Sequence, residues 1–298
     1  MLPVKIGLQL SVSPYTWGFE LTPFLITAYF IIMMLFASWC FLKFSKEAAI
    51  GIILFSIFIY FGLTNMPWLP LILIYGLIGF KIGGLKLSLT IVASFLFITF
   101  TGVLPQALLS IYLCGIAVII SFILGSSLGI WAAHNDKVSA FMRPINDTMQ
   151  TMPSFVILIP FVMFFGIGEF TALLAIIAYA FVPAMRYTEH GLRNLPETVI
   201  EAARMIGCSQ TQLLWKVKIP LAMPVIMLGL NQTIMFGLAM LVIAALVGTT
   251  GLGQLIYIGL SKADFGTGMI SGVSIALIAI IFDRTTQAWR IKLEKKTQ

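Results

Sequence analysis

The chain has 298 residues, of which 60% are hydrophobic and 10% are charged, and its mean hydropathy is +1.04. An ordinary soluble domain carries about 25% charged residues, so this composition excludes a soluble globular protein and predicts a polytopic membrane protein. The formal net charge of +7 is typical of nucleic-acid-binding proteins too, but the placement of the basic residues favours a membrane topology signal.

Nine apolar runs are candidates for membrane-spanning helices, each of which needs about 20 mostly apolar residues. The clearest lie at 24–42, 85–103, 107–133, 153–168, 171–188, 224–248 and 267–283. Two shorter runs, 48–64 and 66–80, are separated by Asn65 and Pro67 and form either two spans or one broken or re-entrant element. We therefore predict an all-α fold with about nine spans, seven or eight being the alternatives.

The basic residues predict how these spans are oriented. If the polar segment 189–223 is cytoplasmic and the spans alternate, all of the 18 Lys and Arg residues except Lys5 and Lys262 face the cytoplasm. This distribution predicts a chain with its N-terminus outside and its C-terminus inside.

The apolar spans hold almost no ionisable residues near their centres, because Glu169, Arg186 and Asp283 lie at predicted ends. A proton-coupled or ion-coupled transporter usually carries Asp, Glu or His inside the membrane. The chain also lacks a GxxxxGK[ST] phosphate loop. The segment GFKIGG at 79–84 has neither its spacing nor its hydroxyl, and we interpret it as a turn between two spans. Energy for transport is therefore expected to come from another chain.

The remaining small motifs carry no chemistry that we can assign. The three cysteines and two histidines are scattered, so neither a disulfide framework nor a metal site is predicted. Two pairs of glycines, Gly125 with Gly129 and Gly268 with Gly272, have the spacing of closely packed helices.

The segment 189–223 predicts a helical elbow outside the bilayer. The stretch Asn194-Leu195-Pro196-Glu197 resembles a helix start, with a capping residue and a proline in the first turn. Val199, Ala203 and Ile206 follow at helical spacing and predict one apolar face. Gly207 is placed to end this helix, because glycine adopts the left-handed conformation without a steric penalty.

A second short helix is predicted after the glycine. Ser209-Gln210-Thr211-Gln212 has the pattern of a capping box. The helix that it starts carries Leu213, Leu214, Trp215 and Val217, and it is expected to end at Pro220.

Physical chemistry alone leaves two interpretations of this elbow open. It is either an amphipathic hairpin resting on lipid headgroups, with Glu201 paired to Arg204 along the helix, or a docking element whose apolar side chains fill a groove of a cytoplasmic partner.

The elbow resembles the EAA motif of ABC importer permeases. That motif reads EAA, three residues, Gly, nine residues, and then an apolar residue, any residue, an apolar residue and Pro. Glu201-Ala202-Ala203, Gly207 and Val217-Lys218-Ile219-Pro220 match each position, with V-K-I-P where the family usually has I-x-L-P. In the family this elbow is the coupling helix that docks into an ATPase. The resemblance implies a coupling role for Glu201, Ala202, Ala203, Gly207, Val217, Ile219 and Pro220.

Further segments resemble the permease subunits of glycine betaine/proline-type importers. These are MQTMPSF at 149–155, FGIG at 165–168, PLAMPVIMLGLNQTIM at 220–235 and GLGQ at 251–254. The resemblance implies a type I ABC importer permease core at 105–290, preceded by accessory spans at 1–104 and followed by a basic tail at 291–298. No fused substrate-binding domain is expected. GLGQ is an external gate, a dock for a binding protein or a plain turn.

The resemblance implies a subunit without enzymatic activity or cofactor of its own, in a bacterial inner membrane. Its implied partners are a second permease copy, most simply identical, two cytoplasmic ATPases that bind ATP, and an external substrate-binding protein. The implied cargo is a small osmolyte or methylamine such as glycine betaine, choline, proline betaine or trimethylamine N-oxide. A stand-alone secondary transporter of small zwitterions is the alternative.

A small zwitterion passing between two permease copies needs weak polar contacts rather than charged walls. Candidate lining residues are Ser121, Ser126, Ser127, Asn231, Gln232 and Thr233. The alternative is that these side chains bond neighbouring helices.

Overall fold

The structure is a computed structural model that describes residues 68–297, without the side chains of Pro70 and of residues 293–297. The chain divides into two compact units at Tyr75 and Gly76, and the account below concerns the second unit from Gly76 onward. The predicted spans at 24–42 and 48–64 lie outside the described residues, and the predicted domain boundary at residue 104 stays a prediction.

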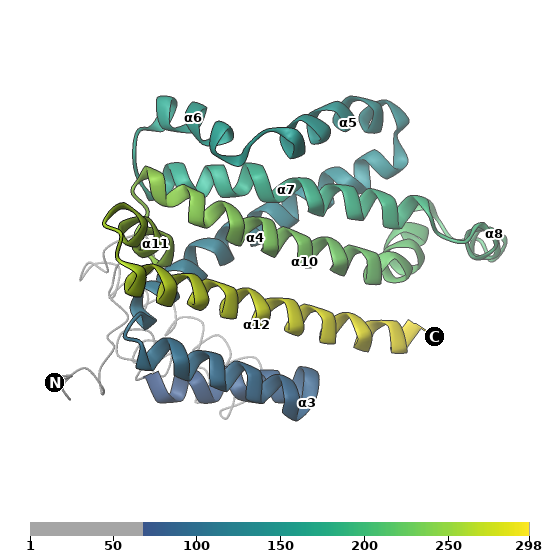
Figure 1. Ribbon diagram of the computed structural model, residues 1–298. Coiled ribbons are helices and arrows are strands. Elements are labelled where there is room, and N and C mark those ends of the chain that lie inside the picture. Colours follow the sequence, from purple (N-terminus) through teal and green to yellow (C-terminus); the bar gives the residue numbers. More distant parts are fainter. Residues whose placement is uncertain (1–67, 298) are drawn as a thin grey trace, which may run out of the picture. The chain divides into compact units, whose positions relative to one another are not determined.

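Every element in the described range 68–297 is helical, and that range contains no strand (Figure 1). The elements are α3 (Trp68–Phe100), α4 (Leu104–His134), α5 (Asp136–Thr151), α6 (Ser154–Phe165), α7 (Glu169–Arg193), α8 (Glu197–Met205), α9 (Gln210–Gln212), the π-helix η3 (Leu213–Lys218), α10 (Ile219–Ala244), the 3-10 turn η4 (Ala245–Val247), α11 (Leu252–Ser261) and α12 (Phe265–Thr297).

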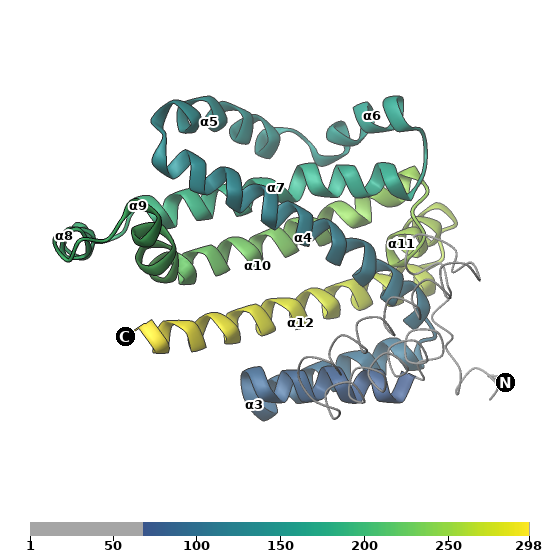
Figure 2. The ribbon, with the colours of Figure 1, turned by 180° about the vertical axis from the view of Figure 1, so that it is seen from behind.

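Helix α3 folds back on itself at Gly84, whose φ of 76° and ψ of −165° are not helical. Beyond Gly76 its two arms lie side by side (Figure 2). Ser88 Oγ donates to the Gly76 carbonyl at 2.8 Å, and a Cβ on Gly79 would lie 2.5 Å from Ile91 Cδ1. The predicted turn at GFKIGG is confirmed, whereas the prediction that its two arms are separate membrane spans stays a prediction.

The centre of the unit is the packing of α7 against α4 and α10. Gly125 and Gly129 of α4 let the two backbones approach closely. A Cβ at Gly125 would lie 2.6 Å from the Phe181 carbonyl, and one at Gly129 would lie 2.6 Å from the Met185 carbonyl. Small residues at such contacts replace a hydrophobic driving force that lipid does not supply. The predicted packing role of this glycine pair is confirmed.

Five helices of the described range are long and apolar enough to cross a membrane, and the pair α5 and α6 makes six if it counts as one span. The span predicted at 153–168 is shorter in the structure, because α6 covers only Ser154–Phe165, and it counts as a span only together with α5, which it meets at a bend of 102°. Pro153 causes the break, since the residue before a proline avoids helical geometry, and Met152 is extended.

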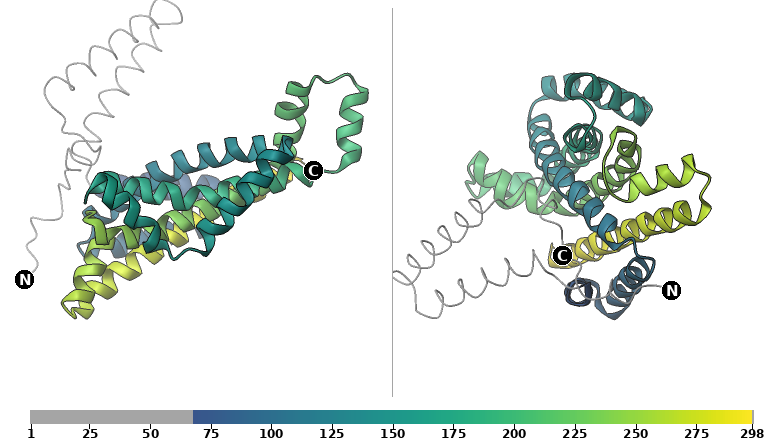
Figure 3. Two further views of the ribbon diagram at one scale, coloured as in Figure 1. Left: turned by 90° about the horizontal axis from the view of Figure 1, so that it is seen from above. Right: turned by 90° about the vertical axis from the view of Figure 1, so that its left-hand side faces the viewer.

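Several side-chain bonds join parts of the chain that the topology predicts on one side of the membrane. Lys292 Nζ donates to the Lys81 carbonyl at 2.5 Å, and Lys218 Nζ lies 3.4 Å from His134 Nε2. The Gly84 turn, the α4–α5 connection, the elbow and the end of α12 therefore share one end of the unit. Helix α11 lies at the opposite end (Figure 3). The described part of the chain thus follows the predicted alternation.

Candidate functional site

The candidate functional site is the elbow between α7 and α10, which projects from one end of the unit (Figure 1). Its first arm, α8, begins after Pro196 without a side-chain cap. The predicted capping role of Asn194 is wrong. Asn194 instead ends α7, where its Nδ2 donates to the His190 carbonyl at 2.8 Å. Helix α7 continues to Arg193, beyond the end of its apolar pattern. Asn194 therefore caps the end of α7 and does not cap the start of α8.

Gly207 ends α8 as predicted. Its φ of 87° is left-handed, its N–H donates to the Arg204 carbonyl at 2.9 Å, and the Cys208 N–H donates to the Ala203 carbonyl at 3.3 Å. This pair of bonds is a Schellman motif, which satisfies carbonyls that the helix end would leave unpaired. No atom lies within 4 Å of a Cβ built on Gly207, so the requirement for glycine is a backbone requirement.

The predicted capping box is also present at the start of the second arm. Ser209 Oγ accepts the Gln212 N–H at 3.3 Å, and Gln212 Oε1 accepts the Ser209 N–H at 3.0 Å. These two bonds satisfy donors at the start of the helix reciprocally. The elbow is therefore shaped on both sides of Gly207 by bonds between near neighbours.

The prediction that the second arm ends at Pro220 is wrong. The arm passes through the π-helix η3 directly into α10, and Pro220 lies in the first turn of α10. The Ile219 N–H bonds to the Leu214 carbonyl five residues back. A proline is tolerated at a helix start because it needs no N–H partner there, and the wide π turn adjusts the helix before it. The second arm is thus continuous with a long apolar helix.

Three large apolar side chains are exposed on the elbow. Met205, Ile206 and Trp215 are 89%, 83% and 63% exposed, whereas Ala203 and Leu213 are buried. Of the three residues predicted to form one apolar face, Ala203 is buried, Val199 is partly exposed and Ile206 is exposed, so this face is covered only in part. Large apolar side chains exposed at a helix tip mark an interaction surface.

The side chain of Glu201 is exposed and forms no hydrogen bond or ion pair within residues 68–297. The local pair with Arg204 that the sequence left open is not formed. The first residue of the motif thus presents an unused carboxylate beside the apolar tip.

At the opposite end of the unit, the GLGQ segment is the start of α11 rather than a free turn. The Leu252 N–H donates to Ser110 Oγ of α4 at 2.9 Å, and Thr250 Oγ1 donates to Glu169 at the start of α7. Two hydrogen bonds, one to α4 and one to α7, therefore anchor the start of α11.

The candidate path residues occupy different environments. Ser121 and Thr233 are fully buried, and Ser121 Oγ lies 3.2 Å from the Ile177 carbonyl of the neighbouring helix α7. Ser126 accepts a 3.4 Å bond from Thr188. Ser127 is exposed and Gln232 is half-buried. The structure brings these residues together only in part, and their role in transport stays a prediction.

Asn231 belongs to a polar contact that sequence reasoning missed. Its Nδ2 donates to Asp283 Oδ1 of α12 at 2.9 Å, and Gln287 Nε2 donates to the same oxygen at 2.7 Å. The residue that could have revealed this contact from the sequence is Asp283, which was predicted to lie at the end of a span. Helix α12 continues past it to Thr297, so the carboxylate lies inside the helix pair.

The elbow and the helices next to it lie in a segment that matches a known protein family. Residues 125–290 match the model of the family described as "Binding-protein-dependent transport system inner membrane component".

Three relatives illustrate the range of similar proteins. The chain is 40% identical to the glycine betaine/proline betaine transport system permease protein ProW of Escherichia coli, over 76% of this chain and 64% of that protein. It is 42% identical to the trimethylamine N-oxide transport system permease protein TmoV of Pelagibacter ubique, over 76% of this chain and 31% of that protein. It is 36% identical to the glycine betaine transport system permease protein OpuAB of Bacillus subtilis, over 80% and 83%. The chain thus spans less than two thirds of the first two relatives.

Solved structures show the same fold. An inward-facing form of the MetNI methionine ABC transporter aligns with a TM-score of 0.58 at 19% identity, over 62% of this chain and 92% of that chain. An amino acid ABC transporter structure with histidines aligns with a TM-score of 0.55 at 17% identity, over 66% and 98%. At these identities the likeness concerns the fold alone.

Proposed function

Because the chain belongs to the family of binding-protein-dependent transport system inner membrane components, we propose that it is the membrane-spanning permease subunit of an ATP-driven importer of a small osmolyte or methylamine. The observation that carries this proposal is the elbow, with its left-handed glycine, its apolar tip and its unpaired Glu201. The chain itself carries out no catalysis and binds no cofactor.

The elbow is the proposed contact with a cytoplasmic ATPase. Met205, Ile206 and Trp215 supply apolar surface for a groove in the partner. Glu201 supplies a carboxylate that has no partner within residues 68–297. The coupling residues are those of the matched motif: Glu201, Ala202, Ala203, Gly207, Val217, Ile219 and Pro220.

Movement of the elbow would reach the membrane through the second arm. The capped start at Ser209, η3 and α10 form one continuous helical rod. When two ATPase copies bind ATP and close, two elbows would be drawn together, and each would move its own α10. Such a rigid-body switch between two states is biased by ligand binding.

The proposed substrate is a methylated amine of the glycine betaine, choline, proline betaine or trimethylamine N-oxide class. The support is that relatives at 36–42% identity are named for glycine betaine, proline betaine or trimethylamine N-oxide transport. An external binding protein would select the substrate, since aromatic side chains can surround a quaternary ammonium group.

The proposed assembly places two identical permease copies side by side in a bacterial inner membrane. The path would run between them. Ser127 and Gln232, which are not fully buried in one copy, are its leading wall candidates, with Ser126 and Asn231 behind them. Ser121 and Thr233 are buried within the chain, so they would support the wall rather than touch the substrate.

Reconstitution with the ATPase and the binding protein tests the coupling assignment. We expect Glu201→Ala to abolish the stimulation of ATP hydrolysis by loaded binding protein while the permease stays folded. Glu197→Ala, which removes an exposed carboxylate from the same helix, is the matched control and should keep the stimulation. Full stimulation in the Glu201 variant would reject the assignment.

Uptake into the same vesicles tests the energy source. Import should require ATP and should persist when an uncoupler collapses the proton gradient at constant ATP. Import that stops with the uncoupler and needs no ATPase would instead support a secondary transporter.

A further inference from the structure

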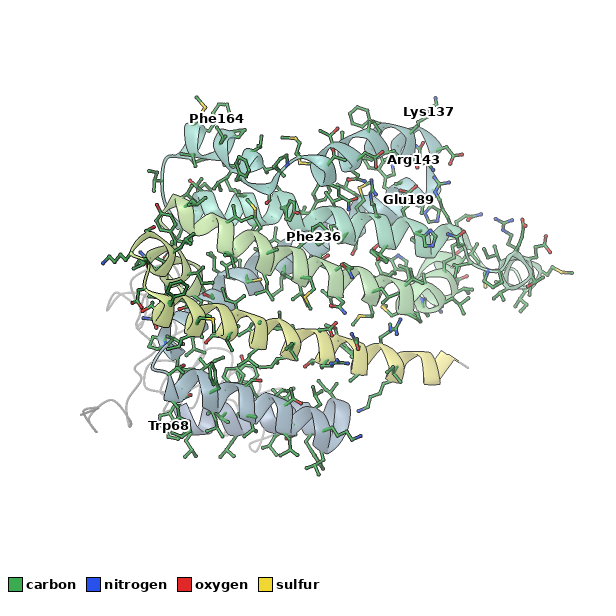
Figure 4. All side chains as sticks on the ribbon, in the orientation of Figure 1. Trp68, Lys137, Arg143, Phe164, Glu189 and Phe236 are labelled. Atoms are coloured by element: carbon green, nitrogen blue, oxygen red, sulfur yellow. The ribbon has the colours of Figure 1, made fainter. Side chains whose placement is uncertain are left out.

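A pocket of about 690 Å³ lies between α5 and the C-terminal part of α7. Figure 4 shows Arg143 of α5 and Glu189 of α7 at this place. We propose that the pocket binds a small zwitterion, with Arg143 holding its anionic oxygen and Asp147 holding its alkylammonium group. The inference rests on the proposed function, because the ligand would be the imported osmolyte. The pocket would bind it near the cytoplasmic end of the permease, in addition to the proposed path between two copies.

Two of the charged groups around the pocket are committed to the structure. Glu189 accepts Ser139 Oγ at 2.6 Å and Arg193 Nε at 3.0 Å, and its side chain is only 13% exposed. Arg193 also donates to Asp136 Oδ1 at 2.8 Å and to the Ala132 carbonyl at 2.7 Å. These bonds hold α5 against α4 and α7, and they leave little capacity for a ligand.

Of the other three charged side chains that line the pocket, Arg186 is paired with Asp147, whereas Arg143 and one oxygen of Asp147 remain available. Arg143 is exposed and forms no hydrogen bond or ion pair within residues 68–297. Asp147 bonds to Arg186 through Oδ1 only, and its side chain is 66% exposed. Arg143 and Asp147 are four residues apart on α5, so they lie one helical turn apart on one face. They do not pair with each other, which leaves a positive and a negative group side by side.

The charged lining of the pocket implies an aqueous setting. Its walls meet the last third of α7, where Asn146 contacts Met185 and Asp147 contacts Arg186. Charged groups facing lipid hydrocarbon are costly, and those found in membrane proteins face water-filled cavities or the bundle interior. The polar helix α5 therefore borders a compartment that water reaches from the cytoplasmic end.

The mixed signs of charge select the ligand class. A purely anionic ligand would meet Asp147, and a purely cationic ligand would meet Arg143. A zwitterion satisfies both. A guanidinium matches the two oxygens of a carboxylate, and the carboxylate of Asp147 attracts an alkylammonium group. The volume lies within the range of small-molecule sites.

The test is direct binding to the complex of permease and ATPase in lipid nanodiscs, without the binding protein. Radiolabelled glycine betaine should bind saturably, and Arg143→Gln should weaken this binding about tenfold, the effect of losing one charge-assisted hydrogen bond. Lys137→Gln is the matched control, since Lys137 is on the same helix but does not line the pocket. It should leave the binding unchanged.

A second probe and a second lipid locate the contact. Choline has the ammonium group without the anionic oxygen, so its binding should change less than about twofold in Arg143→Gln. Binding should be equal in phosphatidylglycerol discs and in discs that also contain phosphatidylethanolamine, whose headgroup is itself zwitterionic. Loss in the second discs would assign the pocket to the headgroup and overturn the proposal.

The inference and the proposed function fail separately. Absent binding, or binding equal in wild type and Arg143→Gln, overturns the pocket while ATP-driven uptake in vesicles leaves the permease function standing. Absence of that uptake rejects the function itself.

Discussion

The elbow and the interface between α4 and α7 both depend on glycine, for opposite physical reasons. Gly207 has no atom within 4 Å of a built Cβ and is needed for its left-handed φ of 87°. Gly129 is helical and is needed because a Cβ would lie 2.6 Å from the Met185 carbonyl. The first requirement is local to the backbone, and the second arises only when two distant helices meet. Substitutions at the two sites should therefore fail in different ways.

The largest effect is expected for Gly129→Leu. A side chain there meets backbone, which cannot move aside as a flexible side chain can, so α4 and α7 must separate. Overpacking of this kind costs about 1–3 kcal/mol and occasionally more, and we expect about 3 kcal/mol. The melting temperature of the purified permease should fall clearly. Gly115→Leu on the same helix, where no atom lies within 4 Å, should change it little. Equal melting temperatures for the two variants would refute the close-contact account.

Gly207→Val should give a smaller loss of stability and a complete loss of coupling. A left-handed non-glycine residue costs about 1–2 kcal/mol, and relief of that strain would reorient the exposed tip of α8. We expect normal assembly in the membrane but no stimulation of the ATPase by loaded binding protein. Gly207→Asn, which tolerates the left-handed conformation, should keep much of the stimulation. If valine and asparagine behaved alike, backbone geometry would not be the cause.

Ser209→Ala removes the other local device of the elbow. Loss of a capping side chain costs about 1 kcal/mol, and Gln212 loses its reciprocal partner. Stimulated ATPase activity should fall in part, whereas the melting temperature should hardly change because α10 is held by packing. Ser209→Asp preserves the cap and serves as the control, and it should retain the activity of the unmodified chain.

The smallest effect is expected after α11, where the backbone can be compared with that at Gly207. Helix α11 ends at Ser261 and is followed by Ala263, whose φ of 53° is left-handed, and the Asp264 N–H bonds to the Gly259 carbonyl at 2.8 Å. This is the arrangement of Gly207 with alanine in place of glycine. Ala263→Gly should stabilise the permease by about 0.5–1 kcal/mol at most, because the relieved strain is partly offset by the greater freedom of the unfolded chain.

The Ala263 comparison is best made near neutral pH. Hydrogen bonds from Thr267 hold the pKa of Asp264 below its usual value, so the adjacent cap of α12 is ionised there. A melting temperature that falls on Ala263→Gly would show that the left-handed residue is not strained.

The sequence predicted the features that neighbouring residues control. The stop at Gly207, the capping box at Ser209 and the turn at GFKIGG each depend on a few consecutive residues. The membrane class and the predicted alternation of the described spans followed from hydropathy and basic residues. The spacing of the motif in 201–220 indicated the family, to which the match over 125–290 assigns the chain.

Only the tertiary structure decided features that depend on partners far along the chain. Asn194 was free to cap either helix, and the length of α7 assigned it to the helix before it. Pro220 permits a helix to end or to begin, and the π turn at 213–218 allowed the second.

The charged pocket shows the same limit most clearly. Arg143, Asp147 and Arg186 are unremarkable as sequence, because basic and acidic residues near span ends are expected there. They meet because Pro153 bends α5 away from α6 and Ser139 bonds α5 to Glu189. Local sequence determines local backbone geometry and the side of the membrane, since both follow from near-neighbour sterics and hydration. Which polar groups face one another across two helices is determined by packing, since those contacts join residues about 40–50 positions apart.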